Sequence, residues 1–149
     1  HISTYVESAW EVDRLIDTTD VTLTLDIGHM ALAGADPVDC VHRWRDRIDH
    51  IHVKDVDRGV LQAAKSDGRA DFDAWWVDVC VPLGAGDVDI DGVLAALVAT
   101  NYDGWLVVEQ DRGPTSVDEL AAVAAGQAAN REWLAHHWLA AGGVLSWST

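Results

Sequence analysis

The stretch His50-Ile-His-Val-Lys-Asp55 decides the fold. Its length and β-branched content are typical of a strand, in which successive side chains face opposite sides. Three polar side chains, His50, His52 and Lys54, therefore share one face, and the apolar residues between them share the other. A strand buried between helices is normally apolar on both faces. We therefore expect the polar face to line a cavity, with residues 55–59 forming a turn at its mouth.

Strands and helices alternate along the whole chain. Alternating or β-branched runs predict strands at residues 1–6, 21–26, 50–55 and 106–109, and residues 77–81 form a short apolar run. Capping motifs and helical periodicity predict helices that begin near residues 8, 36, 59, 89 and 116. Glycines predict a flexible connection at 28–35 and an irregular loop at 82–87. This order predicts an α/β protein with a parallel sheet, about four βα units and a single domain over residues 1–149.

Composition narrows the classes of partner. The chain has 149 residues, is 49% hydrophobic and carries a formal net charge of -15, which is typical of one soluble globular domain. The negative charge argues against nucleic acid and for a small neutral or metal-bridged substrate. Cys40 and Cys80 have no spacing typical of a disulfide framework or a zinc site. No apolar run reaches the ~20 residues of a membrane span and no export signal is visible, so we expect a cytoplasmic protein.

Three residues that could bind a metal ion follow the same pattern. Asp26, His52 and Glu109 each stand near the C-terminal end of a predicted strand, on its more polar face. Taken singly, they are explained as a helix cap, a hydrogen-bonded core histidine and a partner of Lys54 or an arginine. Catalytic groups of a (β/α)8 barrel gather at this end of the strands. Two carboxylates and one imidazole together favour Mn²⁺, Mg²⁺ or Co²⁺.

Further polar residues are expected around the same mouth. His29 follows Asp26 by three positions, and Lys54 and Arg58 lie on or after the central strand. They suit contacts to substrate hydroxyls or proton transfer. Asp55 and Asp57 fit such a role and a solvated rim of mixed charge comparably well.

Four motifs carry a family resemblance: residues 25–29 (LDIGH), 50–55 (HIHVKD), 82–89 (PLGAGDVD) and 102–111 (YDGWLVVEQD). Together they resemble the xylose-isomerase-like barrel superfamily of sugar isomerases and epimerases, and within it the inosose dehydratases of inositol catabolism. The resemblance extends from residue 1 to about 139. A complete TIM-type barrel takes ~250 residues, so the resemblance implies the C-terminal half-barrel.

The resemblance also implies a metal site. Barrels of this family hold one divalent cation through a Glu, an Asp, a His and a second Glu, and the last three correspond to Asp26, His52 and Glu109. The first Glu is expected upstream of residue 1, since Glu7 lies in the following turn. Mn²⁺ or Co²⁺ is the expected ion, with Mg²⁺ as an alternative.

The resemblance associates His29 and Arg58 with the substrate. Enediolate chemistry beside the metal gives Glu109, or the missing first Glu, as the base, and His29 or Lys54 as the group that protonates the departing hydroxyl. His50 and Lys54 share the polar face of the central strand, so we expect them to contact the substrate as well. Ala85 departs from the family pattern, because relatives often have an acidic residue at this position of the glycine-rich loop.

The implied activity is a metal-dependent dehydration of a keto-polyol such as scyllo-inosose. A sugar or sugar-phosphate isomerase or epimerase that forms an enediolate remains an alternative. Another is a catalytically inactive fragment, because half a barrel leaves two open sheet edges and a lumen face without its partner. We expect such a chain to pair with an N-terminal half-barrel or to self-associate. An endonuclease on the same fold is disfavoured by the charge of -15 and by the small number of metal ligands.

Overall fold

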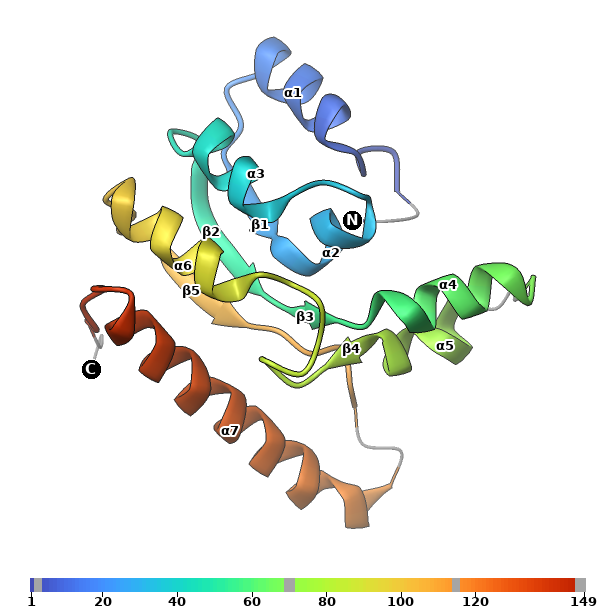
Figure 1. The fold of residues 1–149 in the computed structure, drawn as a ribbon. Coiled ribbons are helices and arrows are strands. Elements are labelled where there is room, and N and C mark those ends of the chain that lie inside the picture. The colour runs from blue at the N-terminus through green and yellow to red at the C-terminus, as the bar shows by residue number, and fades with distance from the viewer. Residues whose placement is uncertain (2–3, 69–71, 114–115, 147–149) are drawn as a thin grey trace.

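Three parallel strands form the central sheet of the computed structural model, which describes residues 1, 4–68, 72–113 and 116–146. Figure 1 shows the sheet with its helices arranged around it. The strands lie in the order β1 (Leu23–Asp26), β2 (Ile48–Val53) and β5 (Trp105–Val108). A second, antiparallel pair joins β3 (Asp55–Val56) to β4 (Cys80–Val81). The parallel sheet with helical connections is a partial TIM-type barrel of the kind predicted.

Five of the seven helices in the described part of the chain begin within one residue of a predicted start. They are α1 (Ala9–Thr18), α2 (Ile27–Leu32), α3 (Pro37–Trp44), α4 (Arg58–Ser66), α5 (Phe72–Val79), α6 (Ile90–Ala99) and α7 (Val117–Ala140). Side-chain caps explain several starts: Asp36 accepts from the N–H of Val38 at 2.8 Å, and Asp57 and Asp89 cap α4 and α6. Within the described residues, no helix combines the length and apolar character needed to cross a bilayer.

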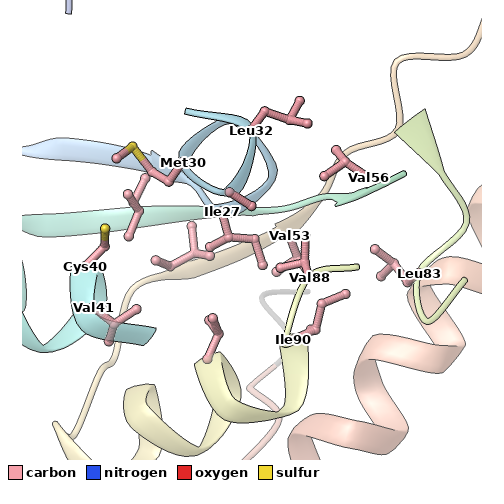
Figure 2. Close-up of a cluster of buried hydrophobic side chains, with 14 of the residues drawn as sticks. Ile27, Met30, Leu32, Cys40, Val41, Val53, Val56, Leu83, Val88 and Ile90 are labelled. Atoms are coloured by element: carbon pink, nitrogen blue, oxygen red, sulfur yellow. The ribbon is translucent and has the colours of Figure 1, made fainter. Parts of the chain in front are cut away.

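The hydrophobic core lies on the helix side of β2. Ile51 and Val53 are fully buried there, as are Val41 of α3 and Leu94 of α6. Helices α3 and α6 contact each other, and Figure 2 shows part of this cluster between helices and strands. Burying a side chain of this size stabilises the fold by about 1.5–3 kcal/mol. The apolar face of the central strand thus anchors the sheet, and its polar face is left for other contacts.

Two predictions about elements were wrong, and the short apolar run at 77–81 carried no prediction of an element type. Of the strand predicted at residues 1–6, the described part is a bend without strand pairing. The connection predicted at 28–35 contains α2, because the Asp26 side chain caps a helix there. The run at 77–81 ends a helix, α5, and contributes only a two-residue strand that pairs antiparallel with β3. A short apolar run does not by itself distinguish a strand from a helix.

Asp55 is a structural residue and not part of a solvated rim. Its side chain is buried, with the whole residue 1% exposed, and it accepts backbone N–H groups from Val56, Gly84, Gly86 and Val88 at 2.9–3.2 Å. A charged carboxylate with this many donors is well satisfied despite its burial. Asp55 therefore fixes the path of the glycine-rich loop after β4.

Candidate active site

The sheet register brings the three predicted metal ligands to one side. Asp26 lies opposite His52, and His52 lies opposite Val107 on β5. Glu109 is two residues beyond Val107, and its N–H donates to the carbonyl of Val53 at 3.1 Å, so the strand pairing continues past the end of β5. Paired residues of parallel strands share a face, and residues two apart in a strand share it too. The three side chains therefore meet at the C-terminal ends of the strands.

The potential ligand atoms of these three residues converge on one point. Asp26, His52 and Glu109 each offer one ligand atom, and these atoms lie within 4.8 Å of one another. His52 Nδ1 is in contact with Glu109 Oε2 and lies 3.9 Å from Asp26 Oδ2. These three atoms are buried, and no described residue forms a hydrogen bond with any of them. Unsatisfied polar atoms are costly in a protein interior, so three together indicate a missing partner.

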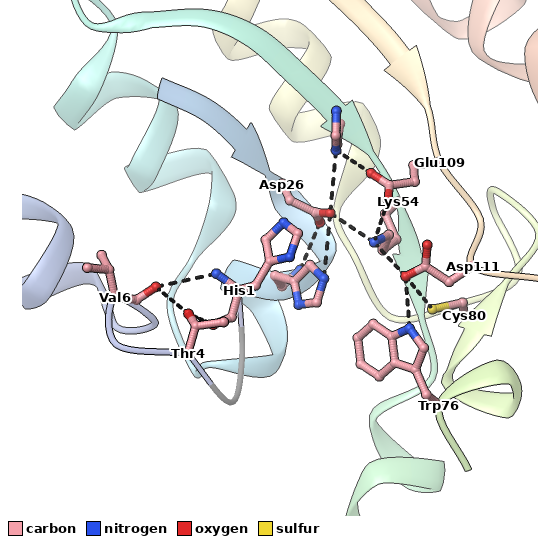
Figure 3. A network of polar contacts seen from close by, with 11 residues as sticks. His1, Thr4, Val6, Asp26, Lys54, Trp76, Cys80, Glu109 and Asp111 are labelled. Atoms are coloured by element: carbon pink, nitrogen blue, oxygen red, sulfur yellow. Dashed lines mark hydrogen bonds and ion pairs between the residues drawn. The ribbon is translucent and has the colours of Figure 1, made fainter. Parts of the chain in front are cut away.

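Lys54 lies beneath this cluster. Its side chain is 0% exposed, and Nζ lies 2.9 Å from Asp26 Oδ2 and 3.3 Å from Glu109 Oε1 (Figure 3). Burial lowers the pKa of Lys54, but the nearby carboxylates outweigh it, so the pKa lies above its ordinary value. Close packing continues behind it, because a Cβ at Gly28 would lie 2.8 Å from Lys54 Cγ. The ammonium thus contacts the carboxylates from the interior side and not the open side.

His29 stands beside the cluster on α2. Its N–H donates to Asp26 Oδ1 at 3.0 Å, and its Nε2 lies 3.8 Å from Asp26 Oδ2. The ring is stacked between His1 at 3.9 Å and Trp76 at 5.0 Å, measured between ring centroids. Burial lowers the pKa of His29 to about 4, although the Asp26 charge opposes the shift. His29 is therefore a neutral imidazole at neutral pH.

Asp111 and Trp76 belong to the same network and were not predicted as site residues. Asp111 Oδ2 accepts from Lys54 Nζ at 3.0 Å and from Trp76 Nε1 at 2.8 Å. Burial raises the pKa of Asp111, but the Lys54 and Trp76 hydrogen bonds outweigh it and leave the pKa below its ordinary value. The spacing of two from Glu109 was the available signal for Asp111. No local pattern connects Trp76 of α5 to this site.

The structure does not bring every predicted residue into the cluster. His50 contacts its neighbour Asp49, with Nδ1 and Oδ1 3.0 Å apart. Arg58 is exposed at the start of α4, and its N–H donates to Asp87. Glu7 is not among the groups of potential ligands found within the described residues. Substrate roles for His50 and Arg58 therefore stay predictions, as does an upstream fourth ligand.

The residues present fit a divalent cation. Two carboxylate oxygens and an imidazole nitrogen are suitable ligands for Mn²⁺, Co²⁺ or Mg²⁺. Asp26 Oδ2, His52 Nδ1 and Glu109 Oε2, the three atoms without a hydrogen bond among the described residues, come from this donor set. Asp26 also caps α2, and Glu109 also forms an ion pair with Lys54. Both carboxylates therefore have a structural role in addition to the possible role as metal ligands.

Sequence relatives and solved structures that resemble this chain point to the same protein family. A rhizopine catabolism protein, MocC of Rhizobium meliloti, is 40% identical over 148 residues, which cover 98% of this chain and 44% of the relative. An inosose dehydratase of Geobacillus kaustophilus is 37% identical over 146 residues, 95% of this chain and 46% of the relative. A crystal structure of a xylose isomerase domain protein from Planctomyces limnophilus has a TM-score of 0.63 at 21% identity, covering 90% and 44% of the two chains.

The chain spans about half the length of these relatives. The profile of the xylose isomerase-like TIM barrel matches residues 1–136, which is most of the sequence. The parallel strands, the motif-bearing strand ends and the similar structures all agree with that match. The chain therefore belongs to the xylose isomerase-like TIM barrel family.

Proposed function

We propose that this chain supplies the metal-binding part of an enzyme that dehydrates a cyclic keto-polyol, most closely scyllo-inosose. One observation carries the proposal: buried atoms of Asp26, His52 and Glu109, which form no hydrogen bond with the described residues, converge at the C-terminal ends of three adjacent strands. The choice of substrate rests on the similarity to inosose dehydratase. A bound divalent cation would polarise the ketone oxygen and the adjacent hydroxyl of the substrate.

The side chains around the ion would move the protons. Glu109 is the more accessible carboxylate, at 28% exposed against 2% for Asp26, so we assign to it removal of the C–H proton beside the ketone. The hydroxyl one carbon further then departs, and the removed proton leaves with it as water. Since the proton lost by carbon is gained by the leaving group, no external acid or oxidant is required.

His29 and Lys54 would assist this transfer in different ways. His29, neutral at working pH, can accept the proton from Glu109 and pass it to the departing hydroxyl. Lys54 stays charged and lies against the ligand carboxylates, where it would favour the negative charge that develops on substrate oxygen. Its complete burial supports an electrostatic role rather than direct contact with the substrate.

The same site also suits an isomerase or epimerase. Proton removal beside a ketone is the shared first step, and returning the proton to carbon instead of expelling a hydroxyl gives an isomer. Incubation in D₂O separates the two outcomes. Deuterium gained by recovered sugar without loss of water supports the isomerase or epimerase. Loss of one water, which gives an enol that tautomerises to a 1,2-diketone, supports the dehydratase.

We further propose that the site works within a complete barrel. A TIM-type barrel takes ~250 residues, while the matches cover 44% and 46% of the two relatives. The remaining strands would come from an N-terminal half-barrel, and a fourth carboxylate ligand with them. An inactive fragment is the alternative when that half is missing.

The decisive experiment measures turnover of scyllo-inosose by the chain and by its assembly with an N-terminal half-barrel from a relative, with Mn²⁺, Co²⁺ or Mg²⁺. The expected result is metal-dependent formation of the dehydrated 1,2-diketone, lost in His52→Ala and Asp26→Asn. His42→Ala is the control, because His42 is exposed on α3. Activity that survives both ligand substitutions and chelation contradicts the proposal.

A further inference from the structure

The carboxylate of Asp111 joins two side chains that have no direct hydrogen bond to each other in the described structure. Its Oδ2 accepts from Lys54 Nζ at 3.0 Å and from Trp76 Nε1 at 2.8 Å. Cys80 Sγ lies 3.9 Å from the same oxygen. Figure 3 shows Asp111 between the lysine and the indole. One oxygen atom thus connects the segment after β5, the segment after β2 and helix α5.

The two hydrogen-bond partners of Asp111, Lys54 and Trp76, each contact a different part of the metal-binding cluster. Lys54 contacts the ligand carboxylates of Asp26 and Glu109. Trp76 is stacked on His29 with ring centroids 5.0 Å apart and planes 17° apart. The backbone N–H of His29 in turn donates to Asp26, and the ring Nε2 of His29 lies 3.8 Å from Asp26 Oδ2. A closed ring of contacts therefore runs from Asp26 through Lys54, Asp111, Trp76 and His29 back to Asp26.

Asp111 is well placed to fix this ring because the residue before it is anchored on two sides. The preceding residue, Gln110, donates from Nε2 to the carbonyl of Cys80 at 3.2 Å. Its Oε1 accepts from Asn130 Nδ2 at 3.0 Å, and Asn130 is buried on α7. Gln110 thus ties the segment to β4 and to α7. A side chain on so constrained a backbone can hold its partners in one geometry.

Asp111 would still hold Lys54 in place when Asp26 and Glu109 bind a cation. Lys54 has three ammonium protons and three nearby carboxylates, and two of these carboxylates are the proposed ligands. A bound ion would draw the oxygens of Asp26 and Glu109 away from Lys54. Asp111 is then the remaining carboxylate, among the described residues, that holds the ammonium in place.

We propose that Asp111 is a positioning residue: it holds Lys54 directly, in the place where the ammonium stabilises negative charge, and it orients His29 for proton transfer through the Trp76 indole. The expected effect of Asp111 on turnover rests on the proposed function. Its expected effect on the orientation of Lys54 and His29 does not. Asp111 touches neither the cation nor the substrate in this assignment. Its removal should therefore alter turnover while the three ligands keep their affinity for metal.

The test compares Asp111→Ala, Asp111→Asn and Trp76→Phe in the full chain and in its barrel assembly. The first change removes both hydrogen bonds. The second keeps a carbonyl oxygen that can accept from the indole but weakens the contact with Lys54. The third keeps an aromatic ring against His29 and removes its N–H. Asp118→Asn on the exposed first turn of α7 is the matched control.

Nuclear magnetic resonance of the metal-free chain gives the structural readout. Trp76→Phe assigns the indole N–H signal of Trp76, and His29→Gln assigns the ring signals of His29. We expect Asp111→Ala to shift both sets of signals, Asp111→Asn to preserve them and Asp118→Asn to leave them unchanged. An unchanged His29 signal in Asp111→Ala overturns the proposal, because the indole would then be held by other contacts.

Kinetics and calorimetry give the second readout. Loss of a residue that orients catalytic groups commonly costs roughly 10- to 100-fold. We expect that loss in kcat for Asp111→Ala, a smaller one for Asp111→Asn, and KM and Mn²⁺ affinity within about threefold of the parent. An Mn²⁺ affinity that falls in step with kcat overturns the positioning role. A folded parent assembly that binds Mn²⁺ but leaves inosose unchanged contradicts the proposed function, and the resonance comparison still decides the role of Asp111.

Discussion

Lys54 Nζ lies 2.9 Å from Asp26 Oδ2, yet that oxygen accepts no hydrogen bond from the described residues. The two charges form an ion pair. A carboxylate oxygen carries two lone pairs, so one lone pair of Asp26 Oδ2 stays available for a cation. Charge compensation from the interior side and an open lone pair on the other side are together what a cation site requires.

Lys54→Met should separate stability from metal binding. The substitution leaves buried carboxylates without their counter-charge, and breaking a buried ion pair in this way costs about 3–5 kcal/mol. It also removes a positive charge that competes for Asp26 and Glu109, so Mn²⁺ affinity should stay the same or rise. Chemical denaturation with and without Mn²⁺, together with calorimetry, measures both effects.

Lys65→Met is the matched control, since Lys65 is exposed on α4. Turnover by Lys54→Met in the barrel assembly should fall far more than its metal affinity changes. A clear loss of Mn²⁺ affinity in a folded Lys54→Met protein would show that Lys54 holds the ligands in their binding geometry.

His29 should make the stability of the metal-free chain depend on pH. Its folded pKa of about 4 lies below the ordinary 6.5, so between these values the unfolded chain binds a proton that the folded chain does not. Folding stability therefore rises as pH increases from 4 to 6.5, by up to about 3 kcal/mol from this group. Urea unfolding at several pH values in this window measures the slope.

The variant His29→Gln should show a shallower slope over the same pH range. His42→Gln, which changes an exposed histidine of α3, should keep the parental slope. Equal slopes in all three proteins would contradict a buried, neutral His29.

The local parts of this site could be predicted from the sequence, and the non-local parts could not. Strand alternation placed Asp26, His52 and Glu109 on one face because the period of two is a local property. The complete burial of Lys54 depends on the close approach of Gly28, which no spacing reveals. The link from Asp111 to Trp76 joins residues 35 apart and depends on how α5 packs.

The two aspartates after β2 should differ in their contribution to stability. Asp55→Asn replaces a buried acceptor of four N–H groups by an amide whose NH₂ faces some of those donors, so we expect a loss of roughly 2–4 kcal/mol. Asp57→Ala removes only a helix cap on α4 and should cost about 1 kcal/mol. Thermal and urea denaturation of both variants check the order, and a reversed order contradicts the structural role of Asp55.

The last prediction is that the isolated chain associates as ionic strength rises. Strands β1 and β5 form the edges of the described parallel sheet, and β5 exposes Trp105 at 59% and Val107 at 37%. Unpaired strand edges with apolar side chains favour pairing with another chain. The net charge of -15 opposes association at low salt, and screening weakens that repulsion.

Light scattering between about 20 and 300 mM NaCl should therefore show a growing average mass. Val107→Lys places a charge on the exposed edge strand and should suppress the growth, whereas Val117→Lys, on the exposed start of α7, should not. Addition of an N-terminal half-barrel should also suppress self-association, because it covers the same edges. A monomer at every salt concentration, or equal effects of the two lysine substitutions, would show that the β5 edge is not the associating surface.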